Sequence, residues 1–129
     1  MTEWKWLLRE AIERIHADQL REHGGLPGVK DENALEAALA RPANKAAYED
    51  PDAAALAAAY LFGIVRNHPF SDGNKRTGWL AAYTFLRIHN YRLTASNAEV
   101  VVFVLAVAAG EIEEDGAAAF FRDHIVPLP

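Results

Sequence analysis

Eleven residues near the middle of the chain combine the side-chain types that phosphate chemistry requires. The segment reads His68-Pro-Phe-Ser-Asp-Gly-Asn-Lys-Arg-Thr-Gly78 and lies between two apolar stretches that predict helices. Five of its residues stand where the second helix is expected to begin: Asp72, Gly73, Asn74, Lys75 and Arg76. Free N–H groups and the helix dipole favour an anion at a helix N-terminus. The segment therefore predicts a phosphate-binding site.

The charges in this segment indicate what accompanies the phosphate. Lys75 and Arg76 add positive charge, and an arginine can bind a phosphate through two hydrogen bonds. Asp72 would repel a phosphate directly, so we expect a hard Mg²⁺ ion between them. His68 is the nearby group suited to take a proton at neutral pH. The residues predict a magnesium nucleotide with His68 as general base. The alternative is that Asp72 only caps a helix and that Lys75 and Arg76 are a solvated face.

Capping and turn residues place the helices that hold this segment. The expected helices span residues 7–23, 32–40, 53–67, 73–88, 96–110 and, from 113 or 114, up to 123. Gly24 and Gly25 end the first helix, Asp31 caps the second, and Ser96 with Glu99 forms a capping box for the fifth. The stretch 53–67 is apolar nearly all round, which predicts a buried central helix.

The connecting segments are less regular. The second helix is expected to close at Ala40 before Pro42, with a loop and one turn over residues 41–49. Asp50 and Pro51 are expected as the N-cap and first residue of the third helix. The segment Trp4–Trp6 is compatible with a short strand or an extended lead-in. Residues 91–94 form a second strand-like stub and a candidate partner for it.

Composition bounds the fold class. The 129 residues include 25 alanines and 13 leucines, the best helix formers, and no cysteine. We therefore expect an all-α single domain over residues 1–129, without disulfides or thiolate metal ligands. The net charge of -5 gives no basic field for direct nucleic-acid binding. The longest apolar run is about half a membrane span, and the N-terminus is not a secretory signal, so a cytoplasmic location is expected.

The central segment resembles the signature of the Fic/Doc superfamily, H-x-F-x-[D/E]-G-N-x-R. Further stretches resemble its Doc (death-on-curing) branch, and together they cover nearly the whole chain: Gly24-Gly25-Leu26-Pro27-Gly28, Asp31, Ala37-Ala38-Leu39-Ala40-Arg41-Pro42, Arg66-Asn67, Phe85-Leu86 and Asn90-Tyr91. The resemblance implies a compact helical toxin whose motif loop lies between two central helices.

The resemblance also implies roles for individual residues. His68 matches the base that activates a target hydroxyl, and Phe70 matches an aromatic that anchors the loop. Asp72 matches the Mg²⁺ ligand. The phosphate-binding anion hole corresponds to Gly73, Asn74 and Arg76.

Two positions separate this chain from the AMP-transferring members of the superfamily. Lys75 stands where those members have glycine, and Trp79 stands where they have a second arginine. This is the Doc-type pattern, which implies transfer of the γ-phosphoryl group of ATP to a threonine of elongation factor Tu, arresting translation. The alternatives are adenylyl transfer to a protein hydroxyl, and a catalytically silent module that binds an antitoxin or DNA.

Three further features bear on the site and its regulation. Arg66, two residues before His68, is a candidate phosphate or target contact or a solvated helix end. His16 and His23 are expected at the surface or in a groove, and not as metal ligands. No Ser or Thr is followed four residues later by Glu, so the self-inhibiting helix of many Fic proteins is absent. The resemblance implies restraint by a small antitoxin whose disordered tail folds as a helix in a groove.

Overall fold

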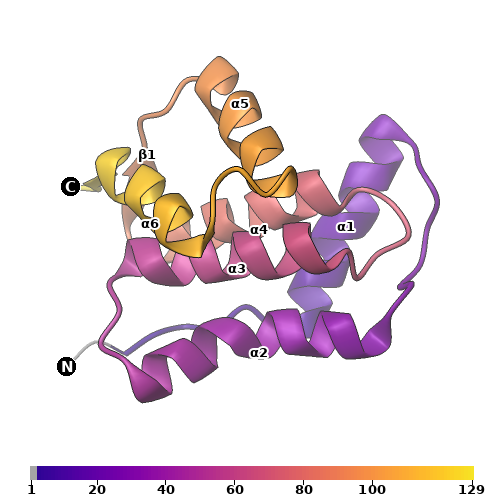
Figure 1. Ribbon diagram of the computed structural model, residues 1–129, viewed down its shortest axis with the longest axis horizontal. Coiled ribbons are helices and arrows are strands. Elements are labelled where there is room, and N and C mark those ends of the chain that lie inside the picture. Colours follow the sequence, from indigo (N-terminus) through magenta and orange to yellow (C-terminus); the bar gives the residue numbers. More distant parts are fainter. Residues whose placement is uncertain (1–2) are drawn as a thin grey trace.

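The computed structural model describes residues 3–129, which form six helices and one small two-stranded sheet. The elements in chain order are α1 (Arg9–His23), α2 (Glu32–Tyr48), α3 (Ala53–Asn67), α4 (Asn74–Ile88), β1 (Tyr91–Leu93), α5 (Asn97–Ala108), α6 (Glu114–Asp123) and β2 (Ile125–Pro127). Figure 1 shows α3 between α2 and α6, with α4 behind it. The expected all-α architecture is confirmed, and the motif loop lies between the central helices α3 and α4.

Helix α3 is the centre of the molecule, as its apolar sequence predicts. Eleven of its 15 residues are buried, and it packs against α2, α4 and α6. Its first turn is capped by Asp52, whose side chain accepts a hydrogen bond from the Ala55 N–H at 2.9 Å. The predicted bounds of this helix are confirmed, although the cap is Asp52 and not Asp50.

Glycines allow α3 to approach its neighbours closely. A Cβ atom at Gly78 of α4 would lie only 2.7 Å from Cγ2 of Val65. A Cβ at Gly63 would lie 3.3 Å from the Cα of Ala38 on α2. The two helices that flank the motif loop are therefore packed without spare space at this contact.

The predicted end of α2 is wrong. Instead of closing before Pro42, the helix continues to Tyr48 with Pro42 buried inside it. An interior proline costs a helix about 3 kcal/mol, because it lacks an N–H and crowds the preceding turn. Here the second half of α2 packs Ala46 against the core and holds Lys45 between Glu49 and Glu114, which offsets that cost. Local proline rules could not anticipate these contacts.

The predicted pairing of the strand-like segments is also wrong. β1 pairs antiparallel with the C-terminal β2, with Tyr91 opposite Pro127 and Leu93 opposite Ile125. Trp4 and Trp6 are extended, as one of the two alternatives had it, and their rings pack against Phe85. Residues 125–127 are too few for an alternation of apolar and polar side chains to predict a strand.

The remaining boundaries agree with expectation within two residues. α5 carries the predicted capping box of Ser96 and Glu99, and α6 begins at Glu114. Among residues 3–129, no helix combines the length and apolar character that a membrane span requires.

Candidate active site

The loop between α3 and α4 is bounded by two residues in the left-handed backbone region. His68 closes α3 with φ 48° and ψ 57°, and its N–H donates to the Ile64 carbonyl at 3.2 Å. Gly73 opens α4 with φ 75°. A positive φ is uncommon for a residue other than glycine, so the conformation of His68 is imposed by its surroundings. The His68 side chain is exposed, and no hydrogen bond to it is found within residues 3–129.

Phe70 anchors the loop in the core, as predicted. Its side chain is 1% exposed. The buried amide of Asn74 bridges its backbone: the Phe70 N–H donates to Oδ1 and the Asn74 Nδ2 donates to the Phe70 carbonyl, both at 3.0 Å. The Asn74 side chain is thus occupied in holding the loop, and its backbone N–H remains for a ligand.

His16 of α1 lies under the same loop. Its ring stacks on Phe70 with centroids 3.9 Å apart and planes 12° from parallel. Its Nε2 is 2.8 Å from the backbone carbonyl of Asp72. His16 is 5% exposed, so the expectation of a surface or groove position is wrong.

The segment that follows α1 runs beside the motif loop. Val29 forms a β-bridge with Phe70, the Ser71 N–H donates to the Gly28 carbonyl, and the N–H groups of Lys30 and Asp31 donate to Pro69. These bonds hold the segment between α1 and α2 against the motif loop.

Asp72 is turned toward the start of α4. Its Oδ1 accepts a hydrogen bond from the Gly73 N–H at 2.9 Å, and its Oδ2 lies 3.4 Å from the Leu26 N–H. The N-cap of α4 is Gly73, and no side chain caps this helix. Asp72 is therefore not the N-cap residue of α4, although its carboxylate accepts the N–H of that residue. Its exposed carboxylate keeps lone pairs for a further ligand.

The first turn of α4 presents free donors beside this carboxylate. Within residues 3–129, the backbone N–H groups of Asn74, Lys75 and Arg76 have no protein acceptor. The side chains of Lys75 and Arg76 are exposed at the same place. Three N–H groups and two cations next to one carboxylate suit a phosphate bound together with a divalent cation.

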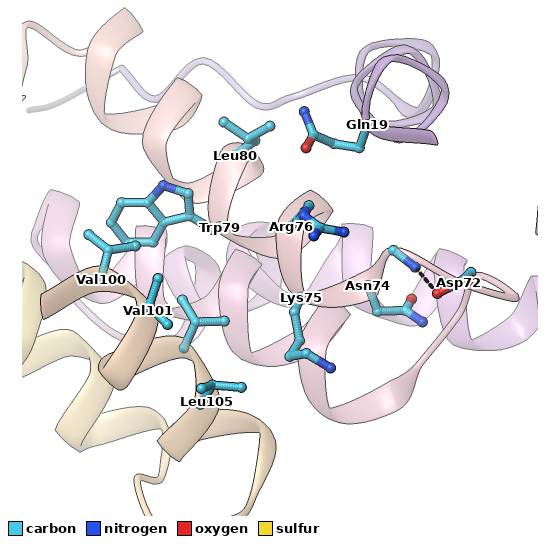
Figure 2. Close-up of a pocket in the computed structure, with 12 residues that line it drawn as sticks. Gln19, Asp72, Asn74, Lys75, Arg76, Trp79, Leu80, Val100, Val101 and Leu105 are labelled. Carbon is cyan, nitrogen blue, oxygen red and sulfur yellow. Dashed lines mark hydrogen bonds between the residues drawn. The ribbon is translucent and has the colours of Figure 1, made fainter. Parts of the chain in front are cut away.

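A pocket of about 450 Å³ opens at this helix start. This volume falls within the range of small-molecule sites. Figure 2 shows its polar end, formed by residues 72–76, and an apolar side that α4 and α5 supply. The apolar side consists of Trp79, Leu80, Val100, Val101, Val104 and Leu105.

The structure gathers most, but not all, of the predicted site residues in this pocket. Asp72, Gly73, Asn74, Lys75 and Arg76 line it. His68 belongs to the same loop but is not part of the lining.

Arg66 points to a different part of the molecule. Its guanidinium lies 5.1 Å from the centre of the Phe62 ring, and its Nη1 is 3.5 Å from Glu113 Oε1. Of the predicted ligands, Arg66 is the one that the structure directs toward the turn before α6.

Two contributors to the site were not identified from the sequence. His16 follows the buried Ile12 by four residues, so helical spacing could have placed it on the buried face of α1. Gly25 lies against Asp72, since a Cβ there would be 2.9 Å from Oδ2. Its only signal was the glycine pair, which a helix end explains equally well.

Comparisons of the sequence with known proteins identify a family and two relatives. The sequence model of the Fic/DOC family matches residues 6–86, which include the motif loop. The chain is 33% identical over 114 residues to the protein kinase doc of Escherichia phage P1, an alignment covering 88% of this chain and 90% of that protein. It is 46% identical over 74 residues to the toxin Doc of Mycolicibacterium smegmatis, covering 56% of this chain and 57% of that protein.

Proposed function

The chain belongs to the Fic/DOC family, and from this premise we propose that it is the toxin of a toxin–antitoxin pair and a protein kinase. The proposed reaction transfers the γ-phosphoryl group of Mg-ATP to a hydroxyl of a target protein. Two relatives support this proposal, one named a protein kinase and the other a toxin. The observation that carries it is the exposed Asp72 carboxylate beside the three free N–H groups of α4.

The donor set fits a magnesium nucleotide. A single carboxylate with phosphate oxygens is the arrangement that Mg²⁺ favours, because the ion keeps several waters and demands few protein ligands. Asp72 would hold the metal, and the helix start with Lys75 and Arg76 would hold the phosphates. Bound Mg-ATP supplies the phosphoryl group, with its charge partly neutralised by the metal.

His68 is proposed as the general base. Its ring is exposed and has no partner within residues 3–129, so it is free to accept the proton of the attacking hydroxyl. The hydroxyl oxygen bonds to the γ-phosphorus, the bond to the β-phosphate oxygen breaks, and ADP leaves. The proton remains on His68 until solvent removes it.

Two residues favour phosphoryl over adenylyl transfer. Lys75 places a cationic side chain in the first turn of α4, where a glycine would leave open backbone. Trp79 stacks on Phe121 with centroids 5.7 Å apart, so this position supplies an apolar surface and no second arginine. Adenylyl transfer is the competing outcome of the experiment described below.

The proposed target is a translation factor such as elongation factor Tu, modified on a threonine in the cytoplasm. This choice rests on the resemblance to the Doc branch. It is tested separately by offering the purified factor as the acceptor.

The proposed regulator is a small antitoxin that binds as a helix in the pocket. Support comes from the apolar side of the pocket, where Val101 is 57% and Leu105 is 52% exposed. An amphipathic helix covers such a surface with its apolar face. Because the pocket continues to residues 72–76, an occupant there would also obstruct the nucleotide.

The experiment uses ATP labelled at either the γ- or the α-phosphate, with the purified chain, a cell extract and Mg²⁺. We expect a protein band labelled by γ-ATP alone. His68→Ala should abolish labelling while circular dichroism shows an unchanged helical content, because an exposed loop side chain is not part of the core. His23→Ala is the matched control. Labelling by α-ATP would identify an adenylyltransferase, and no labelling would identify a silent module.

A further inference from the structure

We infer that His16 is a positioning residue for the peptide between Asp72 and Gly73. This peptide in turn orients the carboxylate of Asp72, which would hold the metal. The inference builds on the proposed function, because it assumes that Asp72 serves a magnesium nucleotide.

The first observation is the direction of the hydrogen bond. A backbone carbonyl can only accept, so Nε2 of His16 carries the proton and donates it to the Asp72 oxygen at 2.8 Å. The bond joins residues 56 positions apart in the sequence. It therefore fixes the motif loop to α1 and not to its own flanking helices.

The second observation is that the Asp72 carbonyl fixes the direction of the Gly73 N–H. The Asp72 carbonyl and the Gly73 N–H belong to one planar peptide unit, so holding one fixes the direction of the other. The Gly73 N–H in turn donates to Asp72 Oδ1 at 2.9 Å. A continuous path thus runs from the His16 ring through one peptide to the carboxylate.

The third observation is that this peptide needs support. Gly73 has φ 75°, and glycine occupies both signs of φ with similar ease. Around it, α1 lies at van der Waals distance: a Cβ at Gly73 would be 3.6 Å from Leu20 and 3.7 Å from the His16 ring. His16 itself is held by its stacking on the buried Phe70. The buried ring therefore selects one orientation of an otherwise flexible peptide.

Two substitutions separate the hydrogen bond from simple packing. His16→Phe keeps a flat ring against Phe70 but removes the donor. His16→Gln keeps a donor at a similar reach but removes the ring. His23→Phe, at an exposed histidine on the same helix, is the matched control.

Two measurements are made on each protein. Isothermal calorimetry gives the affinity for ATP with and without Mg²⁺. Hydrogen exchange of the amides in residues 70–76, without nucleotide, reports the order of the peptide directly. Thermal unfolding confirms that each variant is folded under the conditions used.

The positioning role predicts that His16→Phe weakens Mg²⁺-dependent ATP binding about tenfold or more, as loss of a residue supporting a metal ligand does. It also predicts faster exchange at Gly73 in this variant, with His16→Gln closer to wild type in both measurements. A role in packing alone predicts that His16→Phe is closer to wild type than His16→Gln, because phenylalanine preserves the stacking on Phe70. The inference would be overturned if His16→Phe bound Mg-ATP as tightly as His16→Gln or more tightly, and protected the Gly73 amide as well or better. If wild type binds no Mg-ATP, the proposed function fails, and the exchange measurement still decides the role of His16.

Discussion

At the scale of single residues, burial divides the motif side chains by role. Asn74 and His16 are buried, and each uses its polar atoms on the loop backbone. Four other motif residues are exposed: His68, Asp72, Lys75 and Arg76. Buried polar groups need partners within the protein, whereas exposed ones can exchange water for a ligand. The loop is therefore held by one set of side chains and presents another for chemistry.

Asp72→Asn is expected to remove the magnesium dependence of nucleotide binding. An amide keeps the shape of the side chain but loses the charge that attracts the cation. Calorimetry with ATP should show wild type binding more tightly with Mg²⁺ than without it, and the variant binding equally in both. Asp123→Asn, at an exposed carboxylate at the end of α6, should behave as wild type. Retained magnesium dependence in Asp72→Asn would exclude this carboxylate as the ligand.

Lys75→Gly is expected to reduce γ-phosphoryl transfer about 100-fold, the usual loss when one charge-stabilising group is removed from a transfer site. Lys75→Arg should retain much of the activity because it keeps the positive charge. Labelling with γ- and α-labelled ATP measures both reactions. Adenylyl transfer should not recover in full, because Trp79 still occupies the second arginine position. Unchanged γ-transfer in Lys75→Gly would remove the lysine from the mechanism.

At the scale of elements, the site depends on how α3 and α4 leave the core. The loop is short, and both helices that bound it are fixed by buried contacts on their inner faces. Glycine at the closest point of approach lets the two axes come together. The start of α4 is therefore set by the packing of the whole helix as well as by the loop.

Gly78→Ala is expected to destabilise the fold by about 1–3 kcal/mol, as overpacking of a buried contact does. The added methyl would lie 2.7 Å from Val65 Cγ2 and 3.4 Å from the Leu61 carbonyl oxygen, and the backbone cannot move aside easily. Urea unfolding measures the effect. Gly116→Ala is the control, because its Cβ would meet a single atom, Cγ2 of Ile112 at 3.0 Å, on an exposed stretch of α6, and alanine improves helix propensity. Equal stability of the two variants would contradict the close packing of α3 and α4.

Asp52 links the start of α3 to the last turn of α6. Its carboxylate caps Ala55 and forms two hydrogen bonds with Arg122, at 2.7 and 3.0 Å. The Arg122 hydrogen bonds hold the pKa of Asp52 below its usual value. Because the folded pKa is the lower one, the stabilisation is present above the unfolded pKa and is lost as pH falls through the folded value.

Asp52→Asn should cost about 0.2–1 kcal/mol at neutral pH, since it keeps the cap and loses an exposed ion pair. Asp52→Ala should cost about 1 kcal/mol more, because the cap is also lost. Urea unfolding at neutral pH, and again below the ordinary aspartate pKa, tests this. The difference between wild type and Asp52→Asn should shrink at the lower pH. A difference that grows on acidification would refute the assignment.

At the scale of the whole molecule, Figure 1 shows α5 standing above α3 and α4. Its residues line two different apolar surfaces. One surface belongs to the pocket that begins at residues 72–76. The other lies on the opposite side, where Val102 and Phe103 meet Phe120. Only the first is continuous with the proposed nucleotide site, so it is the surface through which a bound partner could inhibit directly.

Val101→Asp is expected to weaken binding of the cognate antitoxin at least tenfold, because it places a charge in the apolar side of the pocket. Val102→Asp is the matched control on the other side of α5, where 69% of the residue is exposed. Co-expression with the antitoxin, followed by pull-down and calorimetry, measures the effect. Growth arrest should return for Val101→Asp despite the antitoxin. A loss of affinity confined to Val102→Asp would place the antitoxin on the other surface.

The sequence by itself determined the features that depend on neighbouring residues. The apolar stretch 53–67 defines a buried helix, Ser96 and Glu99 define a cap, and the segment from His68 to Arg76 defines the ligand types and their spacing. Helical periodicity and capping act over one or two turns, so they can be read without the fold.

Only the tertiary structure decided which distant segments meet. In the folded chain, α2 continues through Pro42 and β1 pairs with residues 125–127. Arg66 lies against Glu113, and His16 is hydrogen-bonded to the Asp72 carbonyl. These outcomes depend on the total burial and hydrogen bonding that a packed arrangement provides, which can override a local preference of a few kcal/mol. The motif supplies the reacting groups, and long-range packing sets the directions in which they point.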